Sequence, residues 1–279
     1  MLCCSQGKSS ILCTVNDHIL TWVKFLAVIT ILTLLTIPSA KASEPIMITL
    51  SGAMDKVIFD GKWTFYSEWK PTSLNTISYN DSELIQLRSA HQGNFIYILV
   101  DEVSNIKFNK NTDMAIICFD KNNGKTVIPN ENDYCFGVPL DGKNPFTLRG
   151  SSALNETSHF MNIQNPNSLI GISSISDEND RYSNVPHASY EFKIPTDVVG
   201  RSDTYGFYLG VYNSHSNKIY SWPQNITNDS LLKIPSPSKW GDLVSPDKSL
   251  PEFPWPILAL VSSLAIITFM TRRSAVFHR

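Results

Sequence analysis

The chain has 279 residues, with 23 lysines and arginines against 25 aspartates and glutamates, a formal net charge of −2. Residues 43–250 are more acidic, with 17 basic and 23 acidic side chains. This balance argues against a nucleic-acid partner, which requires a basic surface stripe. The length allows one domain with a full core, or at most two small ones.

The N-terminus has the pattern of an export signal. Lys24 precedes an uninterrupted apolar run over 25–37, and Ala40-Lys41-Ala42 follows with small residues at the positions that a signal peptidase accepts. We therefore expect residues 1–42 to be a signal peptide that is cleaved after Ala42. An uncleaved membrane anchor is the alternative.

Residues 43–232 are rich in short apolar or alternating segments that are typical of β-strands. An Asn- and Gly-containing turn at 91–94 separates two of them, 83–90 and 95–102, which predicts a hairpin. The pattern predicts an all-β fold, an antiparallel β-sandwich of immunoglobulin-like or jelly-roll-like type. Ten strands are expected, at 46–50, 56–59, 83–90, 95–102, 113–120, 133–138, 168–175, 187–194, 205–213 and 218–222.

Two cysteines, Cys118 and Cys135, remain once a leader is removed, and they fall on neighbouring predicted strands. Exported proteins retain disulfides, so we expect these two to be bridged. Two buried free thiols are the alternative. Four Asn-x-Ser/Thr sequons in polar, turn-like sequence point to the same compartment and are candidate glycosylation sites: Asn80, Asn155, Asn225 and Asn228.

The C-terminal part of the sequence predicts a membrane anchor. Residues 233–250 contain three prolines with scattered Ser and Lys, which favours an extended stalk. An uncharged apolar run over 254–270 follows, within the length of a membrane-spanning helix, and Arg272 and Arg273 come next. The basic end favours a cytoplasmic tail at 274–279, with residues 43–250 outside the cell. A buried core helix is the alternative for the apolar run.

Several segments together resemble the family 9 carbohydrate-binding modules and the wider DOMON-like set of sandwiches. They are FDGKW at 59–63, ILVDE at 98–102, DMAIICFD at 113–120, SYEFKIP at 189–195 and GFYLGVYN at 206–213 with YSWP at 220–223. The resemblance covers about 46–232 and implies a β-sandwich that binds sugars. It also implies that Trp63 belongs to the core.

The tail resembles an archaeal C-terminal sorting signal of the PEF type. Its motif is Pro251-Glu252-Phe253-Pro254, directly before the apolar run. The resemblance implies a sorting transpeptidase as a partner, which cleaves near the motif and transfers the protein to another anchor. Residues 251–273 are therefore expected to form a sorting motif followed by a transmembrane helix.

A sugar site requires flat aromatic faces with amides and carboxylates around them. The candidate ligand-binding residues are Trp222, Trp69, Tyr220 and Tyr212. Trp222 is the strongest of them, since it precedes a proline at the end of a predicted strand, and we expect it at the rim of the sandwich. The implied clamp of two tryptophans would be Trp69 with Trp222.

Calcium is the candidate cofactor, because carboxylates flank several predicted strands: Asp113, Asp120, Asp133 and, less central, Asp141. Haem binding through a methionine and a histidine has no supporting spacing. Catalytic motifs of the G-x-S-x-G, H-E-x-x-H and phosphate-loop types do not occur, so an enzyme is not expected. The sequence thus favours a surface-anchored carbohydrate-binding protein, with a structural or adhesive surface protein of the same fold as the alternative.

Overall fold

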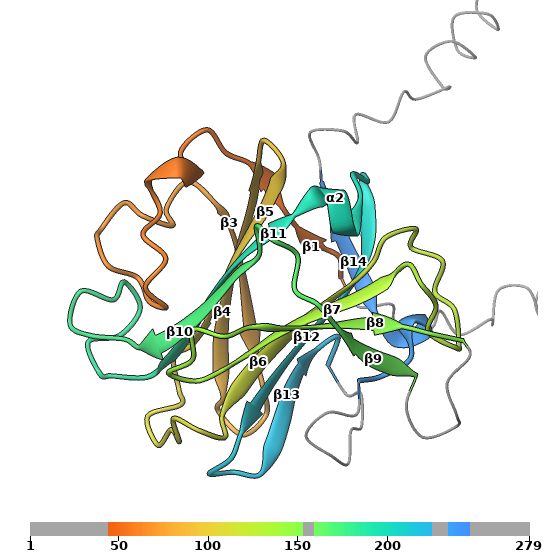
Figure 1. Ribbon diagram of the computed structural model, residues 1–279. Helices are drawn as coiled ribbons and strands as arrows, with labels where there is room; N and C mark the ends of the chain where they lie inside the picture. Colours follow the sequence, from red (N-terminus) through yellow and green to blue (C-terminus); the bar gives the residue numbers. More distant parts are fainter. Residues whose placement is uncertain (1–43, 153–158, 225–233, 246–279) are drawn as a thin grey trace, which may run out of the picture. The chain divides into compact units, whose positions relative to one another are not determined.

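The computed structural model describes residues 44–152, 159–224 and 234–245, all within the unit Ser43–Arg279 (Figure 1). The described residues form two β-sheets and almost no helix. Only three short helical turns occur among them: η1 (Met54–Lys56), α2 (Thr196–Val199) and η2 (Pro237–Lys239). The predicted all-β sandwich is confirmed.

The first sheet has eight strands in the part of the chain that the structure describes. The sheet runs from β1 to β9. Two strands, β13 and β14, pair with the same edge of β12, one along each half of that strand. The members in spatial order are β1 (Ile46–Met47), β14 (Gly241–Val244), β12 (Thr204–Asn213), β6 (Met114–Asp120), β7 (Asp133–Pro139), β8 (Phe146–Gly150) and β9 (Phe160–Ile163), with β13 (Lys218–Trp222) beside β12.

The second sheet has six described strands. Its order is β10 (Ile170–Ile175), β11 (Ala188–Pro195), β5 (Phe95–Glu102), β4 (Leu84–Gln92) and β2 (Thr49–Leu50), and β3 (Ser73–Ser78) pairs with β4. All pairs are antiparallel except β1 with β14 and β2 with β4. Because β1 and β2 are separated only by Ile48, the first extended segment joins both sheets.

The main core lies between the sheets and is filled by the residues of alternate positions. On β5, Ile96, Ile98 and Val100 point into it, as expected for a strand whose side chains alternate between faces. The opposite face of β5 carries Tyr97, Leu99 and Asp101, and these side chains are buried as well. The second sheet is therefore covered on both faces.

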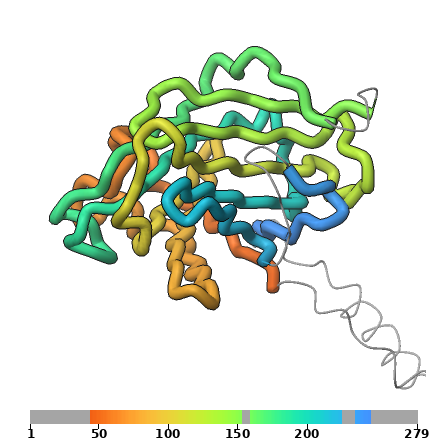
Figure 2. Tube along the Cα trace, turned by 90° about the horizontal axis from the view of Figure 1, so that it is seen from below, coloured from red at the N-terminus to blue at the C-terminus, as the bar shows by residue number. Residues whose placement is uncertain are grey.

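Two irregular segments cover that outer face. Residues 51–72 and 176–187 lie beside one another over β4, β5 and β11 in both views (Figures 1 and 2). A second apolar cluster fills the space beneath them: Met54, Val57, Trp63, Trp69, Ala90, Tyr97 and Leu99. Polar side chains on the outer face of β4, β5 and β11 can thus lie buried beneath these two loop segments.

The predicted hairpin is confirmed, with β4 and β5 antiparallel from Gln86–Asp101 to Gln92–Phe95. The predicted strand at 56–59 is wrong, because this segment begins with the last residue of η1 and belongs to the covering loop. The sequence reading missed β3, β8, β9 and β14, whose apolar positions are few or interrupted by polar residues.

The predicted stalk is wrong for residues 234–245. Leu243 of β14 is fully buried, and β14 pairs with β12 from Thr204–Val244 to Phe207–Gly241. Trp240 is also buried, against Tyr208 and Phe160. The prolines of this segment therefore lead into a strand that lies between β1 and β12, and they do not form an extended linker.

Cys118 and Cys135 form a disulfide between β6 and β7, where they are directly opposite each other. The predicted bridge is confirmed. Among the described residues, no helix is long and apolar enough to cross a membrane. The predicted signal peptide, the apolar run over 254–270 and the sorting motif lie outside the described residues.

Candidate functional site

The covering loops are anchored by a turn at Asp60 and Gly61. Glu191, on the outer face of β11, accepts the backbone N–H groups of Asp60 and Gly61 at 3.0 and 2.7 Å. The same carboxylate accepts the indole N–H of Trp69 at 2.9 Å. Burial raises the pKa of Glu191 well above its usual value, although the N–H donors favour the charged form. One buried carboxylate thus holds three points of the loop.

Glu68 fixes the middle of the same loop. It is 2 % exposed, and its two carboxylate oxygens accept the backbone N–H groups of Ile58 and Thr64 at 2.8 and 2.7 Å. Trp63 donates its indole N–H to the Phe65 carbonyl at 2.6 Å. Buried side chains of residues 58–68 therefore hydrogen-bond to the backbone of the same loop, which makes the loop rigid.

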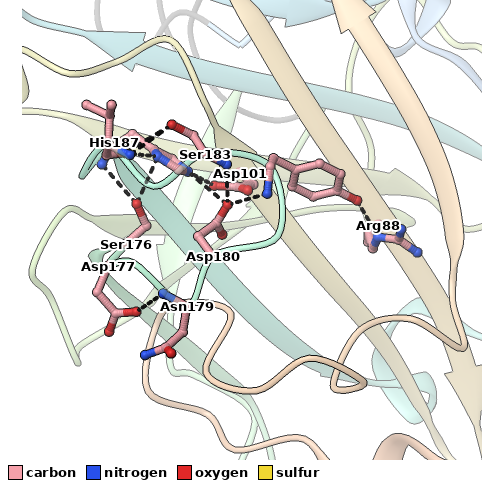
Figure 3. A network of polar contacts seen from close by, with 10 residues as sticks. Arg88, Asp101, Ser176, Asp177, Asn179, Asp180, Ser183 and His187 are labelled. Atoms are coloured by element: carbon pink, nitrogen blue, oxygen red, sulfur yellow. Dashed lines mark hydrogen bonds and ion pairs between the residues drawn. The ribbon is translucent and has the colours of Figure 1, made fainter.

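Arg88 joins the two covering segments. Its guanidinium lies 5.3 Å from the ring centre of Trp63, and its Nε donates to the Tyr182 hydroxyl at 2.6 Å (Figure 3). Its Nη1 donates to the carbonyls of Trp69 and Thr72 at 3.2 and 3.1 Å. The cation is 6 % exposed and bonds to neutral acceptors from both segments.

A second polar network holds segment 176–187 to the sheet. His187 donates from Nε2 to Asp101 at 2.6 Å, and its Nδ1 lies 2.7 Å from the Val185 carbonyl (Figure 3). Asp180 accepts the backbone N–H groups of Tyr182 and Ser183 at 2.7 and 3.0 Å. The side chains of Asp101, Asp180 and His187 are fully buried.

The charges in this network depend on one another. Burial alone would lower the pKa of His187, but the carboxylate of Asp101 and the Val185 carbonyl raise this pKa to about 9. Burial raises the pKa of Asp101 to about 6, against the opposing effect of His187. At neutral pH the pair is accordingly an imidazolium beside a carboxylate.

Ser176, His187 and Asp101 lie in line, but they do not form a nucleophilic triad. A triad imidazole must take the serine proton, whereas His187 Nδ1 already carries a proton toward Val185. Ser176 Oγ accepts the backbone N–H of His187 at 2.9 Å, and Ser176 is only 3 % exposed. The arrangement fits a structural role for Ser176.

An open hollow lies above these networks, where the two covering segments meet. It has a volume of about 460 Å³ and is lined by Thr64, Phe65, Tyr66, Asn179, Asp180 and Arg181. Tyr66 is 70 % exposed, with the Lys70 ammonium 4.7 Å and the Arg181 guanidinium 5.5 Å from its ring centre. Hydrogen bonds from Arg181 and Lys70 lower the pKa of the Tyr66 hydroxyl. We call this the Tyr66 hollow.

The aromatic residues that the sequence favours lie elsewhere. Trp69 is fully buried beneath the loops, and Trp222 and Tyr220 are only 7 % and 6 % exposed in the main core. The expected rim position of Trp222 is therefore wrong, because its indole packs on Phe207 and Gly241. Trp69 and Trp222 belong to different clusters, so no tryptophan clamp forms. Tyr212 is partly exposed at the end of β12, with its hydroxyl on Asn217.

Of the expected calcium ligands, only Asp120 and Asp133 are brought together. Asp113 precedes β6, while Asp120 ends it and lies opposite Asp133 of β7. Asp113 accepts four N–H or O–H bonds, from Asn105, Asn109 and both donors of Ser214. Asp141 pairs with Lys110 at the surface. The fully buried Trp63 agrees with the core role that the resemblance implies.

Sequence reasoning missed the residues of the Tyr66 hollow. The available signal was an aromatic pair, Phe65-Tyr66, within a stretch that lacks strand alternation, because exposed loop aromatics are typical of binding surfaces. Segment 176–187 gave no such signal, since its polar residues read as an ordinary turn. Of the predicted glycosylation sites, Asn80 is exposed in the β3–β4 turn, and the other three lie outside the described residues.

No family model and no curated protein matches this chain. Among solved structures, it is similar to a family 9 carbohydrate-binding module from Caldicellulosiruptor kristjanssonii in complex with cellotriose, at 13% identity and a TM-score of 0.47. That match covers 72% of this chain and 93% of the other. A family 9 module from the same organism in complex with glucose matches at 12% identity and a TM-score of 0.46, covering 72% and 95%.

Proposed function

We propose that this protein is an exported, membrane-anchored surface protein whose sandwich binds carbohydrate at the Tyr66 hollow. The observation that carries the proposal is the exposed ring of Tyr66 on a loop held by buried hydrogen bonds. An aromatic face beside hydrogen-bonding side chains is the arrangement that sugar rings require. Export and anchoring are supported by the apolar segments at 25–37 and 254–270 and by the disulfide.

The loop around Tyr66 is suited to binding because it is ordered before a ligand arrives. Glu68 and Trp63 fix the backbone just before Tyr66, at Thr64 and Phe65. Arg88 bonds to Trp69 and Thr72 within the same loop. A preorganised site loses little conformational entropy on binding. Lys70 and Arg181, which lie over the Tyr66 ring, add N–H donors to the hollow, and they would favour glycans whose hydroxyl or carboxylate oxygens accept hydrogen bonds.

A glycan array probed with the purified protein tests the proposal. The wild type should bind a defined set of glycans, and Tyr66→Ala should weaken that binding at least tenfold. Tyr212→Ala serves as the comparison, since Tyr212 is partly exposed but outside the hollow. If Tyr212→Ala abolishes binding and Tyr66→Ala does not, the site is at the end of β12 and the hollow is the wrong location.

A structural or adhesive surface protein is the second candidate. It is favoured by the burial of Trp69, Trp222 and Tyr220, three of the four aromatics that the sequence offered as sugar platforms. An array on which the folded wild type binds no glycan would support this alternative.

A further inference from the structure

Beneath the Tyr66 hollow, three ligating side chains converge. One ligand atom from each of Asp101, Asp180 and His187 lies within 4.8 Å of the other two. Figure 3 shows the three side chains gathered at one point, with Asp101 at the end of β5 and the others on segment 176–187. His187 Nε2 is 2.6 Å from Asp101 Oδ1 and 3.9 Å from Asp180 Oδ1.

The orientation of His187 is the one that metal-binding histidines adopt. Its Nδ1 donates to the Val185 carbonyl at 2.7 Å and lies 2.8 Å from Ser176 Oγ. A backbone acceptor at Nδ1 fixes the tautomer and the ring plane, and it leaves Nε2 for a metal ion. In this structure Nε2 faces both carboxylates, in direct contact with Asp101 and 3.9 Å from Asp180.

A proton on Nε2 satisfies the site only in part. Asp101 Oδ2 and Asp180 Oδ2 are buried and have no hydrogen-bond partner among the described residues. A buried polar atom without a hydrogen-bond partner is unfavourable. A divalent ion bound by the three side chains would give both carboxylates the partner that the described residues do not supply.

The neighbouring cations are engaged elsewhere. Arg88 donates to Tyr182, Trp69 and Thr72. Arg181 lies over the ring of Tyr66. Lys62 bonds to Asp177, at the start of the same segment. None of these three cations contacts Asp101 or Asp180, which leaves His187 as the only basic group that contacts this pair within the described part of the chain.

We propose that Asp101, Asp180 and His187 bind one divalent transition-metal ion, with zinc as the expected occupant. An imidazole nitrogen favours zinc and its neighbours over calcium, which takes oxygen ligands. Binding replaces the Nε2 proton, which is released to solvent. The three side chains are fully buried, so the ion has a structural role and fastens segment 176–187 to β5.

This site differs from the calcium site expected from the sequence, since it uses none of Asp113, Asp120 or Asp133. It also has a consequence for the Tyr66 hollow, because Asn179 and Arg181 belong to the fastened segment. That consequence rests on the proposed carbohydrate function, whereas the metal site itself does not.

Zinc titration of the full chain tests the proposal. The protein is alkylated without reductant, so that Cys3, Cys4 and Cys13 are blocked and the disulfide is kept, then stripped with a chelator and dialysed. Isothermal titration with zinc should show one equivalent bound, and zinc should raise the melting temperature. Calcium at the same concentration should not compete for this equivalent.

The decisive variant is Asp180→Asn, which keeps the oxygen that accepts the Tyr182 and Ser183 N–H groups. It should still fold, and zinc affinity should fall at least tenfold. His187→Gln should lose the equivalent as well. Asp177→Asn, in the same segment but outside the trio, should bind zinc within twofold of the wild type.

Two outcomes would overturn the proposal. One is a folded wild type that binds no stoichiometric zinc. The other is an equivalent that persists unchanged in Asp180→Asn. Either result would show that His187, carrying its own proton, is paired with the two carboxylates and that no metal ion is bound. Glycan binding is measured separately, so a failed metal site and a failed carbohydrate site give different results.

Discussion

Glu191 accepts the backbone N–H of Gly61 at 2.7 Å, across 130 residues of sequence. Gly61 has φ +92°, and a Cβ there would lie 2.3 Å from the Ser173 carbonyl carbon. The turn is therefore fixed by β11 through a hydrogen bond and by β10 through close contact. This explains the glycine of the FDGKW segment as a requirement of the backbone.

Gly61→Ala should destabilise the fold by more than about 3 kcal/mol, since it adds both a left-handed strain and a clash with backbone. Urea unfolding measures the change. Gly52→Ala is the matched control, because a Cβ at Gly52 meets no atom within 4 Å. It should change the free energy of unfolding by less than about 1 kcal/mol. Equal effects of the two substitutions would show that the turn is not closely packed.

Reduction of the Cys118–Cys135 bridge should lower the free energy of unfolding. The bridge closes a sequence separation of 17 residues, for which chain entropy gives about 3 kcal/mol. The melting temperature with and without reductant is the measurement. The double variant Cys118→Ala/Cys135→Ala should melt at a temperature that reductant does not change. If reductant lowers both melting temperatures equally, the effect does not come from this bridge.

Asp133 should make stability depend on pH. Burial, together with Asp120 opposite it, raises the pKa of Asp133 to about 7. The folded state then binds this proton more strongly than the unfolded state, whose pKa is near 4. The free energy of unfolding should therefore fall as pH rises from about 4 to about 7.

Asp133→Asn removes this titration and retains the oxygen that accepts the Asn130 N–H. Relative to wild type, the variant should gain on the order of 2 kcal/mol between pH 4 and pH 8. Chemical unfolding of both proteins across that range measures the difference. Burial likewise raises the pKa of Glu83 to about 7, but Glu83 is common to both proteins and cancels. A constant difference across the range would contradict the prediction.

The strands of the main core could be predicted from sequence because their apolar residues are dense and their turns carry Gly and Asn. β4, β5, β6 and β12 are examples, and the disulfide followed from the neighbouring positions of β6 and β7. β14 could not be predicted, since Gly241–Val244 offers only two apolar side chains after a proline-rich stretch. Its burial comes from pairing with β12, which is distant in sequence.

The candidate site was less predictable for a related reason. Exposure of an aromatic depends on which loops fold over it, and local sequence does not encode this. Trp69 and Tyr66 are three residues apart, yet one is fully buried and the other is 70 % exposed. The partner that decides the difference for Trp69 is Glu191, on a strand more than 100 residues away.

Trp222→Ala should therefore lower the free energy of unfolding much more than Tyr66→Ala does. Trp222 is 7 % exposed and contacts Phe207, so its truncation leaves a cavity and should cost about 3–5 kcal/mol of stability. Tyr66 buries little surface, and its truncation should change stability by less than about 1 kcal/mol. Thermal melting of both variants measures this pair of effects.

Glycan binding should separate the same two variants in the other direction. Tyr66→Ala should weaken binding at least tenfold while the protein remains folded, because the stacking face of the hollow is lost. Trp222→Ala, assayed below its melting temperature, should bind as the wild type does, since Trp222 does not line the Tyr66 hollow. If the folded Trp222→Ala protein loses binding while Tyr66→Ala retains it, the sugar lies near the end of β13. The platform expected from the sequence would then be the correct one.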